Sequence, residues 1–163
     1  MNRFQNPLTP EKVLIKAQKF CLYRERSEAE MERKMKEWGA APLVVDDILD
    51  QLIEDRFVSN KRFSEAYTRG KFNIKRWGKV KIRQGLKMHK ISEDLIAQAF
   101  LQISSDEYVA TLEKIIQKKM PESIEEWSSQ ERYELKGTLF RTAAQKGYES
   151  DLIFSVLNQI FKE

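Results

Sequence analysis

The sequence predicts an all-α protein made of three tandem three-helix repeats that form an elongated helical array. Apolar residues recur at helical spacing along nearly the whole chain, and no segment has the alternation or the tight-turn dipeptides of a β-hairpin. The apolar pattern itself recurs, with Gly39, Lys90 and Gly147 at equivalent positions 51 and 57 residues apart. We therefore divide the 163 residues into an N-terminal extension (1–9) and three repeats (10–58, 59–103 and 104–163).

The first repeat has recognisable helix ends. Thr9-Pro10 combines an N-cap with a proline suited to the first turn, so we expect a helix from there to about Tyr23. The stretch Ser27-Glu28-Ala29-Glu30 has the spacing of a capping box and begins a second helix, which Gly39 ends. Pro42 begins the third helix. Its inward face carries Val44, Val45, Ile48, Leu49 and Leu52.

The second and third repeats follow the same plan. Two more capping boxes are expected, at Ser104 with Glu107 and at Ser128 with Glu131. The acidic segment 122–127 reads as a linker or a short helix. The expected helices span about 60–72, 78–89, 92–103, 104–120, 128–147 and 149–161.

The internal repeat is the stronger sign of organisation. When Gly39, Lys90 and Gly147 are superposed, seven apolar columns agree without a gap. A supersecondary unit of three helices used again explains a period of this size. The columns are Met31/Ile82/Leu139, Met35/Leu86/Ala143, Val44/Leu95/Leu152, Val45/Ile96/Ile153, Ile48/Ala99/Val156, Leu49/Phe100/Leu157 and Leu52/Ile103/Ile160.

Composition limits the class of protein. The chain is 41% hydrophobic and 33% charged, enough apolar material for a core in a soluble protein. It has no apolar run of the roughly 20 residues that span a bilayer, and its N-terminus lacks the apolar centre of a signal peptide. Cys21 is the only cysteine, so no internal disulfide can form. We expect a cytoplasmic protein that does not contact a membrane.

Charge is concentrated in one stretch of the second repeat. Between residues 61 and 91 there are eleven Lys or Arg and a single acid, Glu65, a net charge of +10. The whole chain carries +4, so the remainder is acidic, at −6. Such a block attracts phosphates or acidic protein surfaces. Its apolar residues keep helical spacing, which predicts two basic amphipathic helices around a turn at Arg76-Trp77-Gly78, with Phe63, Tyr67, Ile82 and Leu86 as the core beneath them.

Residues that could carry catalysis are few. His89 is the only histidine and has no partner for a metal site, so a surface or helix-end role is expected. Cys21 lies on an apolar face and is expected to be buried and inert. Asp46, Asp47 and Asp50, with Glu54 and Asp55, could hold magnesium in a nuclease. They lie on the flank opposite the apolar face, where solvated charge is normal, so we expect no enzyme, cofactor or metal.

The tryptophans allow two interpretations. Trp77, beside the turn, could stack on a base or a partner, but we favour a core anchor. Trp38 ends an apolar stripe and is expected in the core. Trp127, in the acidic segment, has no assigned role.

Three stretches in the first two repeats carry specific motifs. In the first repeat the motif is Ala17-x-x-Phe20-Cys21-Leu22-x-Arg24-x-Arg26-Ser27-x-x-Glu30-Met31-x-x-Lys34-Met35. In the second repeat the motifs are Arg62-Phe63-Ser64-Glu65-Ala66-Tyr67 and Trp77-Gly78-Lys79-Val80-Lys81-Ile82-Arg83-Gln84-Gly85-Leu86. These stretches resemble the first two repeats of a known family, RecX, the bacterial modulators of the RecA recombinase, and the third repeat matches only in pattern. The family would have a glycine at Lys90, so we expect the helix before it to end without a left-handed cap, and Ser59-Asn60 replaces acidic residues.

The resemblance implies a non-enzymatic regulator. Such a protein binds RecA, lies in the groove of the RecA–single-stranded DNA filament and suppresses recombinase and ATPase activity. We expect it to act as a monomer, with many modest contacts along the groove. The alternative is an architectural protein that binds the DNA phosphate backbone without sequence specificity and without RecA. The residues expected to contact the partner or DNA are Arg62, Arg69, Lys71, Lys75, Arg76, Lys79, Lys81, Arg83 and Lys87.

Overall fold

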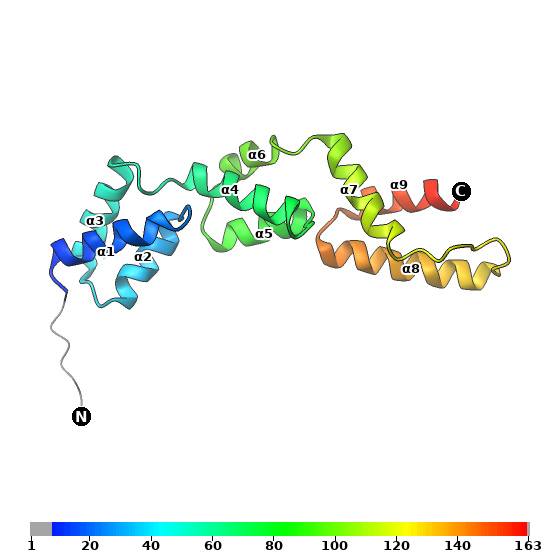
Figure 1. Cartoon of the computed structure of the whole chain (residues 1–163), viewed down its shortest axis with the longest axis horizontal. Helices are drawn as coiled ribbons and strands as arrows, with labels where there is room; N and C mark the ends of the chain where they lie inside the picture. The colour runs from blue at the N-terminus through cyan, green and yellow to red at the C-terminus, as the bar shows by residue number, and fades with distance from the viewer. Residues whose placement is uncertain (1–7, 163) are drawn as a thin grey trace, which may run out of the picture. The chain divides into compact units, whose positions relative to one another are not determined.

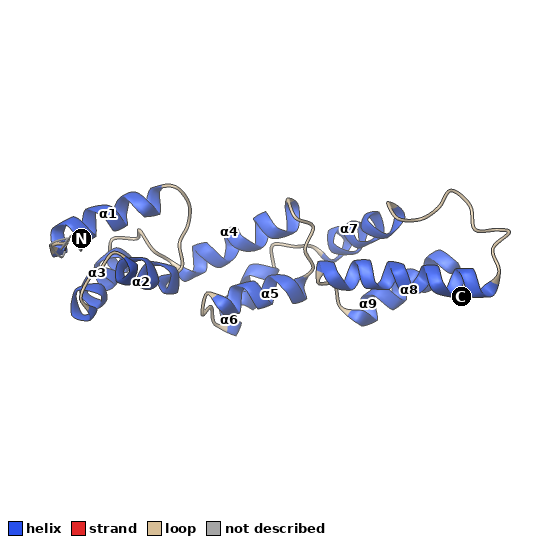
Figure 2. Cartoon of the chain, turned by 90° about the horizontal axis from the view of Figure 1, so that it is seen from below, coloured by secondary structure: helices blue, strands red, loops and turns tan. Residues whose placement is uncertain are grey.

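A computed structural model describes residues 8–162, so residues 1–7 of the predicted N-terminal extension lie outside the described part. Within it the chain forms nine α-helices and no strand, which confirms the predicted all-α class (Figures 1 and 2). None of these helices combines the length and apolarity needed to cross a bilayer. The helices are α1 (Pro10–Leu22), α2 (Glu28–Glu37), α3 (Pro42–Glu54), α4 (Asn60–Asn73), α5 (Lys79–Met88), α6 (Glu93–Phe100), α7 (Ser105–Gln117), α8 (Ser129–Lys146) and α9 (Ser150–Phe161).

The chain divides into two compact units. Of the described residues, 8–67 and 86–99 belong to the N-terminal unit, and 68–85 and 100–162 belong to the C-terminal unit. The division therefore falls inside α4, inside α5 and at the last residue of α6. Each of these helices contributes residues to both units.

The core of the N-terminal unit is centred on α1, α2 and α3, which contact one another (Figure 1). Each of the three helices buries a stripe at three-to-four spacing, as a helix with one apolar face does. Partly buried side chains, Phe20 and Trp38 among them, pack around this centre, with their rings edge-to-face at 5.9 Å. The buried residues are Val13, Ala17, Met31, Met35, Val45, Ile48, Leu52 and Val58.

The C-terminal unit has its core between α7, α8 and α9. Phe72, from the end of α4, packs on Tyr108, and Tyr108 packs on Tyr148, with ring centroids 5.9 and 4.9 Å apart. The loop before α8 is held by Arg132, which donates to the carbonyl oxygens of Ile124 and Trp127. Buried apolar residues on the three helices are Tyr108, Leu112, Ile116, Leu139, Ala143, Ile153, Val156, Leu157 and Phe161.

Burial follows the repeat that the sequence indicates. Four columns are buried in all three repeats: Met31/Ile82/Leu139, Met35/Leu86/Ala143, Val45/Ile96/Ile153 and Ile48/Ala99/Val156. The helix ends recur as well, because the amides of Ala40, Ile91 and Tyr148 donate to the carbonyls of Met35, Leu86 and Ala143. These are the six-to-one bonds of a left-handed helix end.

Lys90 corrects one prediction. Its φ is 56°, so α5 ends in the left-handed region just as α2 and α8 do at Gly39 (85°) and Gly147 (93°). The bond from the Ile91 amide to Leu86 fixes this conformation, although Lys90 has a Cβ that opposes it. The expectation of an uncapped helix end is therefore wrong.

The capping boxes need a second correction. Ser128 and Glu131 form the complete reciprocal pair. At Ser27 and Ser104 the serine oxygen accepts from the amide three residues on, but the reciprocal half is missing among the described residues. At α2 the reason is visible: the Glu30 carboxylate is taken by two arginines instead.

Candidate functional site

The nine basic residues expected to contact a partner divide between the two units. Arg62 and Lys87 belong to the N-terminal unit, where each has an acidic neighbour: Arg62 Nε lies 3.1 Å from Glu25 Oε1, and Lys87 Nζ lies 2.5 Å from Glu93 Oε1. They fall outside the group that the C-terminal unit brings together. That group contains the other seven: Arg69, Lys71, Lys75, Arg76, Lys79, Lys81 and Arg83. Beneath the stretch, Phe63, Ile82 and Leu86 are buried as expected, while Tyr67 is half-buried.

Trp77 organises part of this group. The ammonium of Lys71, near the end of α4, lies 4.7 Å from its ring centroid, and that of Lys81, in α5, lies 4.6 Å away. Such contacts favour a cation over the ring face by about 0.5–1 kcal/mol each at exposed sites. Trp77 is half-buried and not among the core residues, so the preferred interpretation of a core anchor is wrong. It holds two cations at the surface.

A close contact between two glycines brings α8 to this group. The Gly78 amide donates to the carbonyl of Lys146 (2.8 Å), and the Val80 amide donates to that of Gly147 (3.0 Å). A Cβ on Gly78 would overlap the backbone of Gly147, so the approach requires glycine. The amides at the start of α5 have no partner within the helix, and that of Val80 is thus satisfied at the end of α8.

Tyr108 completes this contact. Its hydroxyl accepts from the Lys79 amide (2.8 Å) and donates to Glu149 Oε2 (2.7 Å). Burial, together with the bond to Glu149, raises the pKa of Tyr108 well above its ordinary value, so the phenol stays protonated at physiological pH. Burial raises the pKa of Tyr148 in the same way, and its hydroxyl donates to the carbonyl of Arg76 (3.2 Å).

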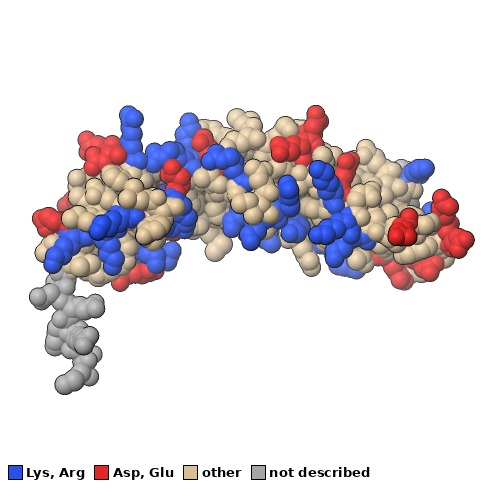
Figure 3. Space-filling model, in the orientation of Figure 1, with Lys and Arg blue, Asp and Glu red and all other residues tan. Residues whose placement is uncertain are grey.

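Lys146 is a cation that the sequence interpretation missed. Its Nζ donates to the carbonyl of Lys75 (3.2 Å), while Lys81 Nζ donates to that of Gln145 (3.3 Å). The repeat pointed to this position, because Lys146 directly precedes Gly147. The superposition aligns this helix end with those at Gly39 and Lys90. In Figure 3, Lys and Arg side chains gather where the end of α8 approaches the start of α5. We call Arg69, Lys71, Lys75, Arg76, Lys79, Lys81, Arg83 and Lys146 the basic surface.

Ring and amide contacts position several cations of the basic surface. Lys79 lies over the Tyr108 ring (4.7 Å), and Arg83 lies 5.4 Å from the Phe100 ring. Arg69 donates to the amide oxygen of Gln102 (2.8 Å). Rings, carbonyls and amides position cations without neutralising them, so the surface is suited to a polyanion or an acidic protein.

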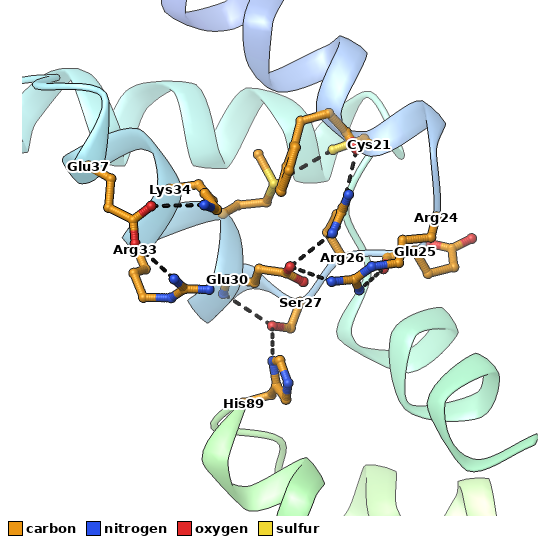
Figure 4. Close-up of polar contacts among 12 residues, drawn as sticks. Cys21, Arg24, Glu25, Arg26, Ser27, Glu30, Arg33, Lys34, Glu37 and His89 are labelled. Carbon is orange, nitrogen blue, oxygen red and sulfur yellow. Dashed lines mark hydrogen bonds and ion pairs between the residues drawn. The ribbon is translucent and has the colours of Figure 1, made fainter. Parts of the chain in front are cut away.

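A second polar cluster lies in the N-terminal unit (Figure 4). Glu30 Oε1 accepts from Arg24 (2.6 Å) and Arg26 (2.9 Å), and Arg26 also lies 3.6 Å from the Phe20 ring centroid. Glu30 is 5% exposed, and its other oxygen has no hydrogen-bond partner. Removal of one member of a buried ion pair leaves the other charge buried without a partner, which destabilises the fold. We therefore interpret this cluster as one that stabilises the N-terminal unit.

His89 is found at a helix end, directly after α5. Its Nδ1 lies 3.1 Å from the Ser27 hydroxyl, and its ring packs on Phe63 at 4.7 Å. The hydroxyl also accepts from the Glu30 amide, so Ser27 joins the start of α2 to the end of α5.

Cys21 and the acidic residues of α3 show no catalytic arrangement. Cys21 was expected to be buried and is half-buried, and burial raises the pKa of its thiol, which lowers its reactivity. Asp46, Asp47 and Asp50 are exposed. Among the described residues no group of three His, Cys, Asp or Glu side chains could hold a metal ion.

Known proteins share both the sequence and the fold. Residues 15–52 match the first three-helix domain of RecX, and residues 59–99 match the second. The chain belongs to the RecX family. The Regulatory protein RecX of Geobacillus sp. (strain WCH70) is 30% identical over 138 residues, 85% of this chain and 49% of that protein. The RecX of Bacillus cereus (strain AH820) is 25% identical over 94% of this chain and 55% of its own length.

Solved RecX structures share the fold. RecX from Lactobacillus salivarius superposes with a TM-score of 0.80 at 18% identity, covering 94% of this chain and 97% of that one. A second crystal structure of regulatory protein RecX gives 0.72 at 22% identity, covering 94% and 74%. The chain spans about half the length of the curated RecX relatives it matches. The two matched domains contain every residue of the basic surface except Lys146.

Proposed function

We propose that this chain is a non-catalytic regulator that binds RecA and the RecA–single-stranded DNA filament and inhibits recombinase and ATPase activity, thereby modulating recombination and DNA repair. The observation that carries the proposal is the basic surface on a RecX-family chain. A RecA–DNA filament presents acidic protein and phosphate together, and eight clustered cations complement both. Membership of the RecX family supports RecA as that partner.

The direct test is the ATPase rate of RecA filaments on single-stranded DNA as the protein is added at near-physiological salt. Inhibition at well below one protein per RecA subunit supports the proposal and indicates action on filament growth. An unchanged ATPase rate, with tight binding to naked DNA in the same buffer, contradicts it.

Charge reversal tests the basic surface itself. Lys75 and Arg83 are both exposed, so Lys75→Glu with Arg83→Glu removes positive charge with little effect on packing. We expect the concentration needed for half-inhibition to rise about tenfold, because steering and positioning are lost, with a melting temperature within about 2 °C of the original. The matched control is Lys12→Glu with Lys19→Glu, the same charge change at exposed positions of α1. Equal inhibition by the folded Lys75/Arg83 variant would reject this surface.

A second candidate function is architectural DNA binding without RecA. The half-buried Trp77, held between two lysines, favours it, because aromatic rings beside cations also suit single-stranded nucleic acid. If free DNA were the main ligand, log K would fall with log salt by about 0.9 per neutralised phosphate. A salt titration of DNA binding, run beside the ATPase assay, separates the two functions.

A further inference from the structure

A groove in the C-terminal unit lies apart from the residues of the basic surface. It is a hollow of about 760 Å³ on α8 and α9, which lie side by side in Figures 1 and 2. Two of the aromatic side chains that line it are exposed to solvent: Tyr133 is 74% exposed and Phe154 is 54% exposed. Phe154 packs on Phe140 with ring centroids 4.7 Å apart. Exposed aromatic residues beside a hollow are typical of protein interaction sites.

Gly137 lies on the lining of this groove in the interior of α8. Glycine there costs the helix about 1 kcal/mol relative to alanine. The fold itself has no need of it, since an added Cβ would meet only Arg141 Nη1, at 3.5 Å, an ordinary contact. At Gly78 and Gly147, where an added Cβ would clash, another helix end approaches closely. Gly137 therefore leaves room on the groove for the backbone of another helix to come close.

The repeat indicates which part of a helix would approach. Arg76 to Arg83 of the second repeat corresponds, 57 positions on, to Tyr133 to Phe140 of the third. The earlier stretch receives the C-terminal end of α8. In the first repeat the equivalent place, at Ser27, receives His89 from the end of α5. Twice in this chain, then, the surface that corresponds to the groove holds the end of a helix.

The charges on the groove favour the same occupant. Lys136 and Arg141 line it, and cations stabilise the negative C-terminal end of a helix. Glu134 is the one acid in the lining, and its carboxylate accepts from Gln130 (2.8 Å). Because α8 begins at Ser129, the amides of this stretch are already bonded within the helix, so apolar and rim contacts must hold the occupant.

We propose that the groove of α8 and α9 binds the C-terminal turns of an amphipathic helix presented by a RecA subunit. This rests on the proposed function and deepens it, because it gives the protein partner a site separate from the basic surface. The aromatic residues are the anchors, and Gly137 allows the helix backbone to come close.

Gly137→Leu tests the groove without weakening the fold. Leucine favours the helix and projects into the hollow, so the melting temperature should stay the same or rise while the groove is filled. We expect the affinity for RecA, measured in the absence of DNA, to fall at least about tenfold, because the leucine side chain would occupy the centre of the contact. The matched control is Ser155→Leu, at an exposed position of α9 that does not line the groove. Tyr133→Ala should weaken binding as well.

The outcomes separate the two levels of the proposal. If wild-type protein neither binds RecA nor inhibits its ATPase, the proposed function and the groove's occupant both fall. If wild type binds and folded Gly137→Leu binds as tightly, the groove assignment alone is overturned. Selective loss of RecA binding in Gly137→Leu and Tyr133→Ala, with Ser155→Leu unchanged, supports it.

Discussion

The two places where one helix meets the end of another use different chemistry. In the N-terminal unit, side chains make the contact: Ser27 bonds His89, and Asn60 Oδ1 accepts from the Glu28 amide (3.0 Å). In the C-terminal unit the backbone makes it, through the Gly78 and Val80 amides and the carbonyls of α8. We call these the side-chain junction and the backbone junction.

Both junctions meet one requirement. The amides at the start of a helix have no partner within it and must find one elsewhere. The Glu28 and Lys79 amides, 51 positions apart, are equivalent in the repeat and are satisfied by Asn60 and Tyr108, respectively. A repeated geometry therefore does not need repeated residues, and the two junctions should respond differently to mutation.

The largest effect is expected from crowding the backbone junction. Gly147→Ala places a Cβ on a residue with a left-handed φ, and this Cβ would also overlap Lys81. The free energy of unfolding should therefore fall by about 3 kcal/mol. Gly39→Ala is the matched control, because Gly39 has a similar φ with nothing within 4 Å, and it should lose only about 1 kcal/mol. Urea unfolding followed by circular dichroism measures both. Equal losses would show that the close approach at Gly147 adds nothing.

A smaller effect is expected at the side-chain junction. Ser27→Ala removes both the N-cap of α2 and the partner of His89 at a fully buried site, so we expect a loss of about 1.5 kcal/mol. Ser128→Ala, at the exposed cap of α8, serves as the comparison and should lose less. The two melting curves give the difference, and a larger loss at Ser128 would refute a junction role for Ser27.

The smallest effect is expected at Lys90, and it tests whether the end of α5 is equivalent to the ends of α2 and α8. Lys90→Gly relieves the left-handed strain that Gly39 and Gly147 avoid, and should raise the free energy of unfolding by about 1 kcal/mol. Lys87→Gly, inside α5, should lower it by a similar amount, about 1 kcal/mol. If Lys90→Gly is also destabilising, the lysine side chain contributes more than its backbone conformation costs.

The sequence was sufficient for whatever depends on local spacing. The Thr9 cap, the proline starts and the complete box at Ser128 fix helix ends through atoms a few residues apart. Of the seven columns that the superposition of three repeats predicted, four are buried in every repeat, since a face that recurs at helical spacing has to be covered.

Longer-range contacts account for what could not be predicted. Glu30 has the spacing of a cap, but Arg26 and Arg24 compete for it. The role of Gly78 depends on Gly147, 69 positions away, and Lys146 joins the basic surface by the same approach. Clustered charge in the sequence located seven of the eight residues of the basic surface, but it could not separate Arg62 and Lys87 from them.

The division of the structure inside α4 and α5 has a consequence for modular engineering. The chain passes between the units three times, after residues 67, 85 and 99. Each unit is therefore made of two separate segments of the chain. Deleting the second sequence repeat, residues 59–103, would remove residues from both units. Because residues 79–85 of α5 belong to the C-terminal unit and residues 86–88 to the N-terminal unit, melting one unit would fray a helix of the other. The boundaries of the second sequence repeat thus differ from the boundaries of the compact units. This difference should couple the unfolding of the two units into one cooperative transition.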